Sequence, residues 1–288
     1  MRCRCNSKAI YFSRSLGEWL CDSCFCEFFE KTVKKRMKEF KIENEKICVG
    51  ISGGKDSTVT LKILNSLGYD VFGIFIDEGI RGYREESKKI IARLKEDLPI
   101  VELSFYDEFG FTLDELVEKF GPEKGCFYCG IFRRYLLNKH ARELKASYVA
   151  TGHNLDDEIQ SVFLSIGRGD WMRLLKIVPK SDKIHDRMLP RIKPLFDLSE
   201  KEVKIYSLLK GIPSHDGVCP YSGHALRAKI REIVDSVEIK QAIKHRIMAS
   251  IEKLPRLKYA RVLTCEKCGE PSSRRTCKTC EMLEEIRG

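Results

Sequence analysis

The sequence predicts an α/β fold with a doubly wound parallel sheet, flanked at each end by a zinc-finger module. Short apolar runs alternate with segments whose apolar residues recur at helical spacing, which is typical of strands joined by crossover helices. A glycine-rich run follows the first apolar strand, and four cysteines in two close pairs stand near each terminus. We therefore expect one ligand-binding domain in the middle of the chain and a small metal-stabilised module at each end.

The central domain is expected to be Rossmann-like. The strand-like runs span residues 46–51, 71–76, 100–104, 148–151 and, less regularly, 192–194. Helical spacing covers residues 58–67, 83–96, 112–120, 131–144 and 155–165. In such a sheet, ligands bind at the carboxyl ends of the strands, where the strand order reverses.

The run after the first strand, Ser52-Gly53-Gly54-Lys55-Asp56-Ser57, is predicted to hold phosphate groups. Glycines let the backbone approach an anion closely, and the following helix offers free N–H groups and the positive end of its dipole. Lys55 can neutralise phosphate charge, and Ser57 can donate a hydroxyl. The run is not a Walker A loop, because Asp56 stands where that loop has Ser or Thr. Without a ligand, the same residues would form an ordinary glycine-rich turn.

Acidic segments follow two later strands. The run Ile76-Asp77-Glu78-Gly79 ends the second strand, and Gly152-His153-Asn154-Leu155-Asp156-Asp157-Glu158 follows a later one. Asp156 and Asp157 open a helix, where a carboxylate would either cap the helix or bind a Mg²⁺ ion that bridges phosphates.

Thirteen cysteines in close spacings favour metal ligation over disulfides, and the odd total fits disulfide pairing poorly. Each terminus offers four thiolates in two pairs, the ligand set of a closed, structural zinc site. At the amino end Cys26 competes with Cys24 as the fourth ligand. The predicted sets are Cys3, Cys5, Cys21 and Cys24 at the amino end, and Cys265, Cys268, Cys277 and Cys280 at the carboxyl end.

Three further cysteines, Cys126, Cys129 and Cys219, lie within the central domain without an obvious fourth ligand. Three thiolates on a [4Fe–4S] cluster would leave one iron open to a non-protein ligand. Alternatively, Cys129 and Cys219 would form a redox pair in which one thiol carries a persulfide. A third zinc site using His215 or His224, or plain burial of small thiols, would also fit the sequence.

The chain is basic and highly charged. Its 52 basic and 42 acidic side chains leave a net charge of +10, which favours a polyanionic partner. No apolar run approaches the ~20 residues of a membrane helix and the start is not a signal peptide, so we expect no membrane and a cytoplasmic location. Cations interleave with apolar residues over 227–258, which predicts a helix with a packed face and a face for a phosphate backbone, or simply a solvated face. The cations are Arg227, Lys229, Arg231, Lys240, Lys244, Arg246, Lys253, Arg256 and Lys258.

Together these motifs resemble the tRNA 2-thiouridine synthetases of the PP-loop ATP pyrophosphatase superfamily. The resemblance spans residues 3–280 and rests on the combination of the glycine-rich loop, segment 152–158, the three central cysteines and the terminal cysteine sets. It implies a tRNA sulfurtransferase that forms 2-thiouridine and converts ATP to AMP and pyrophosphate. Within this family, enzymes of the two-thiouridine synthesis protein A type modify uridine 54, and cytoplasmic thiolases modify the wobble uridine 34. The high charge and the high Lys and Glu content are typical of thermophile proteins, which favours the enzymes that modify uridine 54 of thermophile tRNA.

The resemblance also implies roles for individual residues. Uracil O2 would attack the α-phosphate of ATP, and sulfur held at the open iron would then replace the adenylated oxygen of the extruded base. Catalysis would involve Lys55, Asp56, Asp157 and the three central cysteines, which would hold the [4Fe–4S] cluster, with Mg²⁺ on the phosphates. The residues that would bind ATP are Gly50, Ser52, Gly53, Gly54, Lys55, Asp56, Ser57, Ile76, Arg133, Gly152 and Asp157.

The expected domain organisation has four parts: an N-terminal zinc finger at 1–30, a PP-loop catalytic domain at 31–225, a basic helical tRNA-binding segment at 226–260, and a C-terminal zinc finger at 261–288. The implied partners are tRNA, a second copy in a homodimer, and a sulfur donor, either sulfide or a ubiquitin-like thiocarboxylate carrier. The rival interpretations are thiolation through a persulfide without a cluster, another PP-loop ligase such as a lysidine synthase or an amidotransferase, and a zinc-stapled RNA-binding protein whose loop is vestigial.

Overall fold

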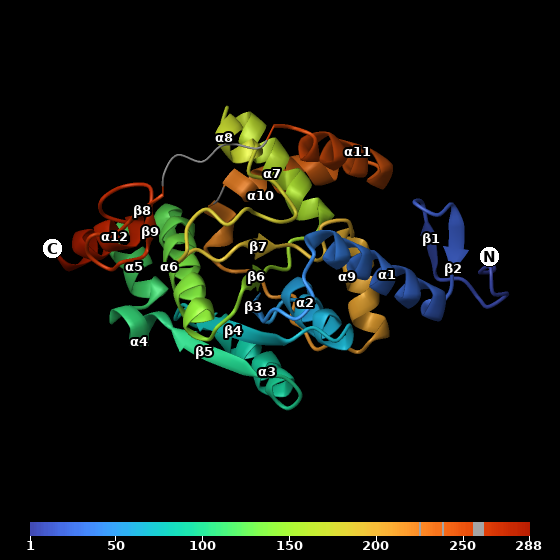
Figure 1. Ribbon diagram of the computed structural model, residues 1–288, viewed down its shortest axis with the longest axis horizontal. Helices are drawn as coiled ribbons and strands as arrows, with labels where there is room; N and C mark the ends of the chain where they lie inside the picture. The colour runs from blue at the N-terminus through green and yellow to red at the C-terminus, as the bar shows by residue number, and fades with distance from the viewer. Residues whose placement is uncertain (225, 238, 256–261) are drawn as a thin grey trace.

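The structure is a computed structural model that describes residues 1–224, 226–237, 239–255 and 262–288. At the centre of these residues lies a five-stranded parallel sheet in the order β5-β4-β3-β6-β7 (Figure 1). The chain moves outward from β3 to β4 and β5, then returns to the other side of β3 for β6 and β7. Strand order therefore reverses between β3 and β6, which confirms the predicted doubly wound sheet. The strands are β3 Ile47–Ile51, β4 Val71–Asp77, β5 Ile100–Ser104, β6 Tyr148–Ala150 and β7 Arg191–Ile192.

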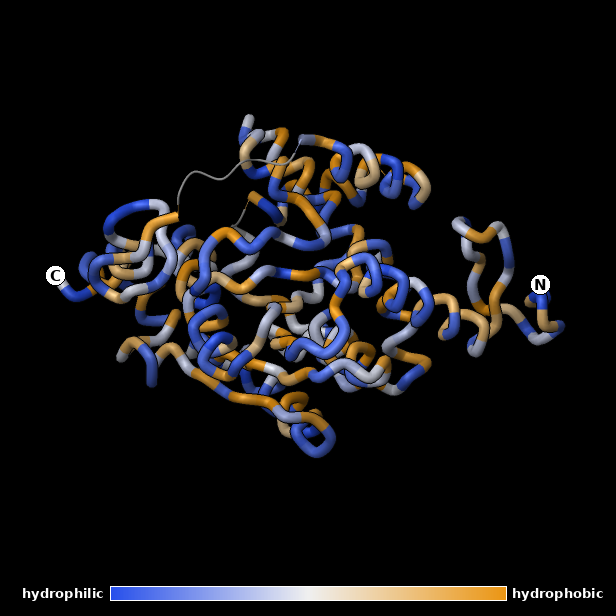
Figure 2. Tube along the Cα trace, viewed as in Figure 1, coloured by the Kyte–Doolittle hydropathy of each residue, from blue (hydrophilic) through white to orange (hydrophobic). Residues whose placement is uncertain are grey.

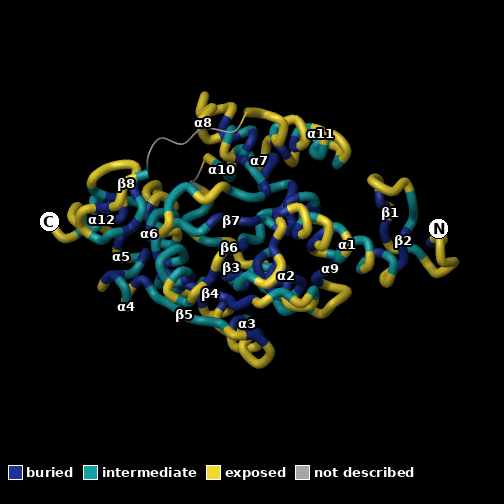
Figure 3. Tube along the Cα trace, in the orientation of Figure 1, coloured by how far each residue is buried: buried dark blue, intermediate teal, exposed yellow. Residues whose placement is uncertain are grey.

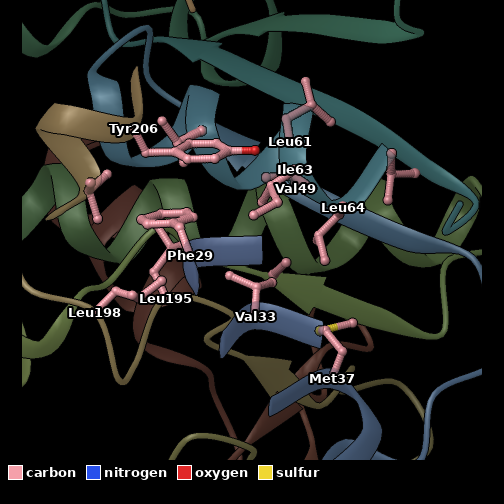
Figure 4. Close-up of a cluster of buried hydrophobic side chains, with 14 of the residues drawn as sticks. Phe29, Val33, Met37, Val49, Leu61, Ile63, Leu64, Leu195, Leu198 and Tyr206 are labelled. Atoms are coloured by element: carbon pink, nitrogen blue, oxygen red, sulfur yellow. The ribbon is translucent and has the colours of Figure 1, made fainter. Parts of the chain in front are cut away.

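One face of the sheet packs against helices α1, α2, α3 and α9. Side chains alternate along a strand, so Ile47, Val49 and Ile51 of β3 all point into this core. Phe29 of α1 stacks on Tyr206 of α9 with ring centroids 4.0 Å apart, and Figure 4 shows both rings among the aliphatic side chains of the core. The helices are α1 Asp22–Phe40, α2 Lys55–Ser66, α3 Arg84–Lys95 and α9 Glu200–Leu209.

The opposite face packs against helices α4, α5, α6 and α12, with Cys48 of β3 and Ile74 of β4 in this second core. Thr112 starts α5 with a capping box to Glu115, as its Ser/Thr-x-x-Glu pattern favours. The strands are mostly hydrophobic in Figure 2 and mostly buried in Figure 3, whereas the outer surfaces of the helices are polar and exposed. The helices are α4 Phe105–Phe109, α5 Leu113–Phe120, α6 Pro122–Glu143 and α12 Lys278–Arg287.

A third group of helices lies beyond β7, where α10 and α11 pack on α7 and α8. The sequence predicts one long basic helix here, but the structure has two helices, of which α10 ends at Ser236 and α11 begins at Gln241. Half of the predicted apolar face is not packed, because Ile233, Val237 and Ile243 are exposed. Arg256 and Lys258 lie outside the described residues. The elements are α7 Leu155–Gly167, α8 Trp171–Leu174, η1 Ser222–His224, α10 Leu226–Ser236 and α11 Gln241–Glu252.

The two cysteine modules lie at opposite ends of the molecule, near the two termini (Figure 1). The N-terminal module is an antiparallel hairpin, β1 Tyr11–Ser13 with β2 Glu18–Leu20, followed by α1, which continues without a break through the expected domain boundary at residue 30. The C-terminal module pairs β8 Leu263–Thr264 with β9 Pro271–Ser272 and ends in α12. No helix among the described residues has the length and apolar character that crossing a membrane requires.

Helix α6 begins nine residues before the predicted start at residue 131. Pro122 occupies its first turn, a position that suits proline because the first N–H groups of a helix have no partner inside it. Gly125 and Gly130 lie inside the helix although glycine costs about 1 kcal/mol there. Gly125 packs closely on Val117 and the ring of Tyr221, which explains the choice at that position.

Candidate nucleotide and cysteine site

The glycine-rich run forms a closed loop between β3 and α2, at the predicted end of the sheet. Gly53 has φ +85°, a conformation that L side chains rarely adopt, and Gly54 is the N-cap of α2. The Ser57 hydroxyl accepts from the Ser52 backbone N–H (3.1 Å) and donates to the Gly54 carbonyl (2.9 Å). The sequence therefore builds a pre-organised turn whose helix N-terminus can receive an anion.

Lys55 lies at the first turn of α2 between two carboxylates. Its Nζ is 3.0 Å from Asp56 Oδ2 and 2.8 Å from Glu200 Oε1. Burial acts to lower the pKa of Lys55, but the charges of Asp56 and Glu200 hold this pKa above its usual value. The side chain is therefore protonated at neutral pH. Glu200 in turn pairs with Arg231 of α10 at 3.0 Å. The partner Glu200 was missed by the sequence analysis, because nothing in its segment marks it as distinct from an ordinary helix start.

The loop after β6 presses against the phosphate loop. A Cβ built on Gly152 would lie 2.6 Å from the Asp56 carbonyl carbon and 2.7 Å from the Ser57 nitrogen, so only glycine allows this approach. Asn154 Nδ2 donates to Asp56 Oδ1 (3.0 Å), and Asn154 caps α7 in a capping box with Asp157. The two loops at the point of strand reversal therefore form one hydrogen-bonded unit.

Asp56 and Asp157 are two partly buried carboxylates at the phosphate-loop end of the sheet. Partial burial raises the pKa of both side chains, and each lies within electrostatic reach of positive charge: Lys55 for Asp56, and Arg227 at 3.2 Å for Asp157. The charge of Asp157 also raises the pKa of Asp56. Carboxylate oxygens are ligands that Mg²⁺ prefers, so both side chains are candidates to bind it.

Glu78, at the end of β4, is fully buried and links the phosphate loop to the central cysteines. Arg84 Nε donates to its Oε2 (2.5 Å), and Arg133 Nε lies 3.1 Å from its Oε1. The same Oε1 is 4.0 Å from Cys129 Sγ, and Arg84 also donates to the Ser52 carbonyl at 3.3 Å. Of this segment only Ile76, which is buried in the core, was predicted as a site residue, as a ligand of ATP; Glu78 was not.

The three central cysteines come from two distant parts of the chain and lie in the same region, although their sulfurs are not all within 4.8 Å of one another as those of each terminal set are. Cys126 and Cys129 lie one turn apart on the same face of α6, and the loop that carries Cys219 runs alongside this turn. Cys126 Sγ donates to the Tyr221 carbonyl at 3.5 Å, and the charge of Cys219 acts on both other thiols. Burial, and then Glu78, raise the pKa of Cys129 to about 12.

His215 holds the segment before Cys219 on the phosphate loop. Its Nδ1 accepts from the Gly217 N–H (3.1 Å), so Nε2 carries the proton toward the Ser52 carbonyl (3.3 Å) and Ser87 Oγ (2.9 Å). The predicted alternative of a third zinc site therefore loses His215, because its ring nitrogens are used by the loop. The side chain of His224 lies outside the described part of the chain.

The two terminal cysteine sets are drawn together as predicted. Among the described residues, the sulfurs of Cys3, Cys5, Cys21 and Cys24, and those of Cys265, Cys268, Cys277 and Cys280, all lie within 4.8 Å of one another in their sets. Neighbouring sulfurs are 3.5–3.9 Å apart, close to the edge of roughly 3.8 Å that a tetrahedron of 2.3 Å Zn–S bonds requires. Cys26 instead packs on the core of α1. Four-thiolate zinc thus fits both sets.

The basic residues of α10 and α11 point partly inward. Arg227 pairs with Asp157, Arg231 with Glu200, and Lys244 with Asp156. These contacts tie the two helices to the phosphate-loop end of the sheet. The expectation that the packed face is apolar and the cations face outward is therefore wrong for these three residues.

Gly50 contributes differently from the other predicted ATP ligands. It lies within β3, and a Cβ there would meet Leu137 of α6 at 3.0 Å, so its small size lets α6 pack on the strand. All the other predicted ATP-site residues, apart from buried Ile76, line the loops at the carboxyl ends of β3, β4 and β6 or the facing turn of α6.

Comparison with known proteins extends over nearly the whole chain. A family model described as a PP-loop domain matches residues 27–237. The chain is 37% identical to tRNA 2-thiolation protein NcsA of Haloferax volcanii over 99% of both proteins, and 35% identical to cytoplasmic tRNA 2-thiolation protein 1 of Arabidopsis thaliana over 99% of this chain and 84% of that protein. Among solved structures, the U34-tRNA thiolase NcsA from Methanococcus maripaludis with its [4Fe–4S] cluster is similar, with a TM-score of 0.85 and 32% identity over 99% of this chain and 96% of that one.

Proposed function

This chain belongs to the PP-loop family of tRNA 2-thiolation proteins, and we propose that it is an ATP-dependent tRNA uridine 2-sulfurtransferase. The observation that carries the proposal is the gathering of Cys126, Cys129 and Cys219 beside the phosphate loop. Glu78 contacts Cys129, and its partner Arg84 contacts Ser52, so a single buried carboxylate joins the two halves of the site.

In this proposal the phosphate loop binds ATP and activates the uridine. Uracil O2 attacks the α-phosphate, and pyrophosphate leaves. Lys55 and the N-terminus of α2 stabilise the negative charge that develops on the phosphates. Asp56 and Asp157 would hold Mg²⁺, whose role is to neutralise and align the phosphate oxygens. Adenylation converts a poor leaving oxygen into a good one, so that sulfur can replace it at C2.

Cys126, Cys129 and Cys219 fit a [4Fe–4S] cluster. They supply three thiolates, and His215 is unavailable as a fourth ligand because it binds the phosphate loop. When bound to three thiolates, the cluster would offer one iron to an incoming sulfur. The same loop that supplies Cys219 is fixed to α6, so these residues hold the sulfur-handling centre next to the activated base.

We propose wobble uridine 34 as the first target. The support is full-length similarity to a solved thiolase whose name specifies that position. Uridine 54, which the sequence composition favoured, is the second candidate, and the Lys and Glu content remains its support. The names of the plant and algal relatives also support a cytoplasmic location. Sulfide or a ubiquitin-like thiocarboxylate carrier would supply the sulfur, and a homodimer is the expected assembly.

The test is in vivo and in vitro thiolation by cysteine variants. Cys126→Ala, Cys129→Ala and Cys219→Ala should each abolish 2-thiouridine in tRNA while the protein still binds ATP. Cys26→Ala is the matched control, because this thiol lies outside all three cysteine groups, and it should retain thiolation. Mass spectrometry of nuclease fragments measures 2-thiouridine and assigns its position.

The variants also separate the rival activities. Full thiolation by Cys126→Ala together with Cys219→Ala would contradict the proposal and favour a ligase that needs no central thiols. Iron and sulfide analysis of anaerobically purified protein distinguishes the cluster from a persulfide: a fully active protein without iron supports the persulfide route through Cys129 and Cys219.

A further inference from the structure

We propose that Arg134 and Arg191, with Arg173 nearby, form a binding site for one phosphodiester group of the RNA substrate, on the part of α6 that follows Cys129. The proposal rests on the proposed function, because that function supplies the RNA. It names a contact that the motifs did not indicate, since none of these three arginines belongs to the phosphate loop or to the basic segment 227–258.

The site contains a recess between α6, β7 and the C-terminal cysteine module. It has a volume of about 280 Å³ and is lined by Arg134, Tyr135 and Asn138 of α6, Arg191 of β7, and Lys278 at the start of α12. Cavities for drug-sized ligands are about 300–1,000 Å³, so this recess suits a small group such as a phosphate better than a nucleotide.

The arginines have no counter-ion in the described part of the chain. The side chains of Arg134, Arg173 and Arg191 make no hydrogen bond or ion pair with any described residue. Neighbouring arginines do have carboxylate partners, such as Glu78 for Arg133. Glu270 also lines the recess, but Arg142 and Asn138 bind its carboxylate. Arg134 and Arg191 thus line one recess without an anion of their own among the described residues, and Arg173 of α8 lies within electrostatic range of Arg134.

Their mutual repulsion is visible in the electrostatics. Burial and the charge of Arg134 lower the pKa of Arg191 to about 10. Burial and the charge of Arg173 likewise lower the pKa of Arg134. A bound phosphate would relieve this repulsion, and arginine is suited to the role because its guanidinium binds phosphate oxygens in a bidentate manner.

Gly130 makes room for the site next to the cysteines. A Cβ at this position would lie 2.9 Å from Arg134 NH1, so the guanidinium folds back over the glycine in the middle of α6. Gly130 directly follows Cys129, and the charge of Cys129 acts on Arg134. A phosphate held by Arg134 would therefore lie close to the nucleotide whose base reaches Cys129.

The experiment compares the full-length metal-loaded protein with the variant Arg134→Gln/Arg191→Gln. Fluorescence anisotropy with a tRNA transcript should show affinity weakened about ten- to hundredfold, because charge-assisted hydrogen bonds to one phosphate are lost. The slope of log affinity against log salt should become shallower by about one. Arg93→Gln/Lys89→Gln on exposed α3 carries the same charge change and should bind as wild type.

Ethylation interference on the tRNA gives a readout that a purely structural role would not produce. In the wild-type protein, neutralising one phosphate beside the thiolated uridine should weaken binding, and in the double variant that position alone should lose its effect. The melting temperature of the variant should be equal to or higher than that of wild type, because repulsion is removed. Arg134→Gln alone gives the same direction of change if the double variant folds poorly.

Two results would overturn the inference. The first is wild-type tRNA affinity and an unchanged interference pattern in both variants. The second is normal tRNA binding with lost inhibition by inorganic pyrophosphate, which would assign the arginines to that product. A wild-type protein that fails to bind tRNA overturns the proposed function as well, so the two failures are distinguishable.

Discussion

At Gly152, a single hydrogen atom in place of a side chain lets two loops of the site touch. The backbone of Asp56 and Ser57 fills the space that a Cβ would need. The consequence is geometric: the β6 loop positions the start of α2, and with it the side chain of Lys55. A role for Gly152 next to the nucleotide stays a prediction, whereas its packing against the phosphate loop is a direct property of the structure.

We expect Gly152→Ala to weaken ATP binding at least tenfold and to reduce the free energy of unfolding by about 1–3 kcal/mol, because the overpacked backbone must shift. Gly167→Ala, at the end of α7, is the matched control: nothing lies within 4 Å of its Cβ position, so stability should change little. Isothermal titration with ATP and thermal melts measure the two effects. Unchanged ATP affinity in Gly152→Ala would contradict this account.

His153 gives the molecule a predictable acid sensitivity. Burial lowers the pKa of this histidine from 6.5 to about 4, and its Nδ1 lies 2.8 Å from the Thr151 hydroxyl. Between these pH values the unfolded chain binds a proton that the folded chain does not. The contribution of His153 to stability is therefore lost as the pH falls from about 6.5 toward 4.

The variant His153→Gln should lack this pH dependence. The unfolding free energy of wild type should therefore fall by about 2 kcal/mol more than that of the variant between pH 7 and pH 4.5. Urea melts across this range measure the difference. His245→Gln on α11 controls for the loss of one histidine elsewhere. Parallel stability curves for wild type and His153→Gln would show that the ring is not held neutral by its surroundings.

At the scale of the elements, Glu78 joins β4, α3 and α6. Its buried carboxylate binds Arg84 of α3 and Arg133 of α6, so the positions of these helices relative to the sheet depend on one charge. Glu78→Gln would leave two arginines without their anion, and we expect it to reduce the free energy of unfolding by about 3 kcal/mol. Urea denaturation measures this change.

The control for this prediction is Glu86→Gln on the exposed side of α3, which should be neutral within about 0.5 kcal/mol. The Glu78→Gln protein should also lose thiolation, because Arg84 is released from Ser52 and Arg133 from Cys129. A stable and fully active Glu78→Gln protein would show that the contacts of Glu78 with Arg84 and Cys129 are not needed for thiolation.

The elements that sequence reasoning placed well are those with a local signal. The strands 46–51, 71–76 and 100–104 match β3, β4 and β5 within a residue, since each is a short apolar run between turns. The start of α6 was misplaced, since two glycines, Gly125 and Gly130, lie in its first half and the contacts of Gly125 with Val117 and Tyr221 have no local signal. Likewise, local periodicity does not show the ion pairs that join α10 and α11 to the site.

The candidate site divides in the same way. The phosphate loop and the terminal cysteine sets could be recognised because the residues of each motif lie close together in the sequence. Glu200 and His215 were not assigned their roles, because each acts through a partner more than a hundred residues away. Glu78 acts partly through Cys129, which lies 51 residues further along the chain. Only Glu78 had a usable signal, an acidic residue directly after a buried strand.

At the scale of the whole molecule, the two cysteine modules are fastened to the central domain by specific side chains. Tyr11 in the N-terminal hairpin donates to Glu202 of α9 at 2.9 Å. In the C-terminal module, Arg142 of α6 binds Glu270, and Lys119 of α5 donates to the Ile286 carbonyl at 2.8 Å. The modules are thus extensions of the domain, and we expect each to need a bound metal for its own fold.

A strong zinc chelator should therefore unfold both modules while the sheet persists. The native protein should contain two zinc ions per chain, and hydrogen exchange after chelation should increase at residues 1–21 and 263–287 but not in β3 or β4, because segments this short have little core of their own. Cys277→Ser should retain one zinc ion and show fast exchange only at the carboxyl end. Cys26→Ala should retain both ions, and loss of zinc in that control would contradict the assigned ligand set.

The crossing of the chain at His215 has a further consequence for how the protein can vary. Only three residues separate this histidine from Cys219, so an extended tether of at most about 14 Å connects the nucleotide loop to the third thiol. Length changes elsewhere on the surface are tolerable, but an insertion in this short stretch would increase the distance between the phosphate loop and Cys219. Tolerance to insertions should therefore reach its minimum between residues 215 and 219.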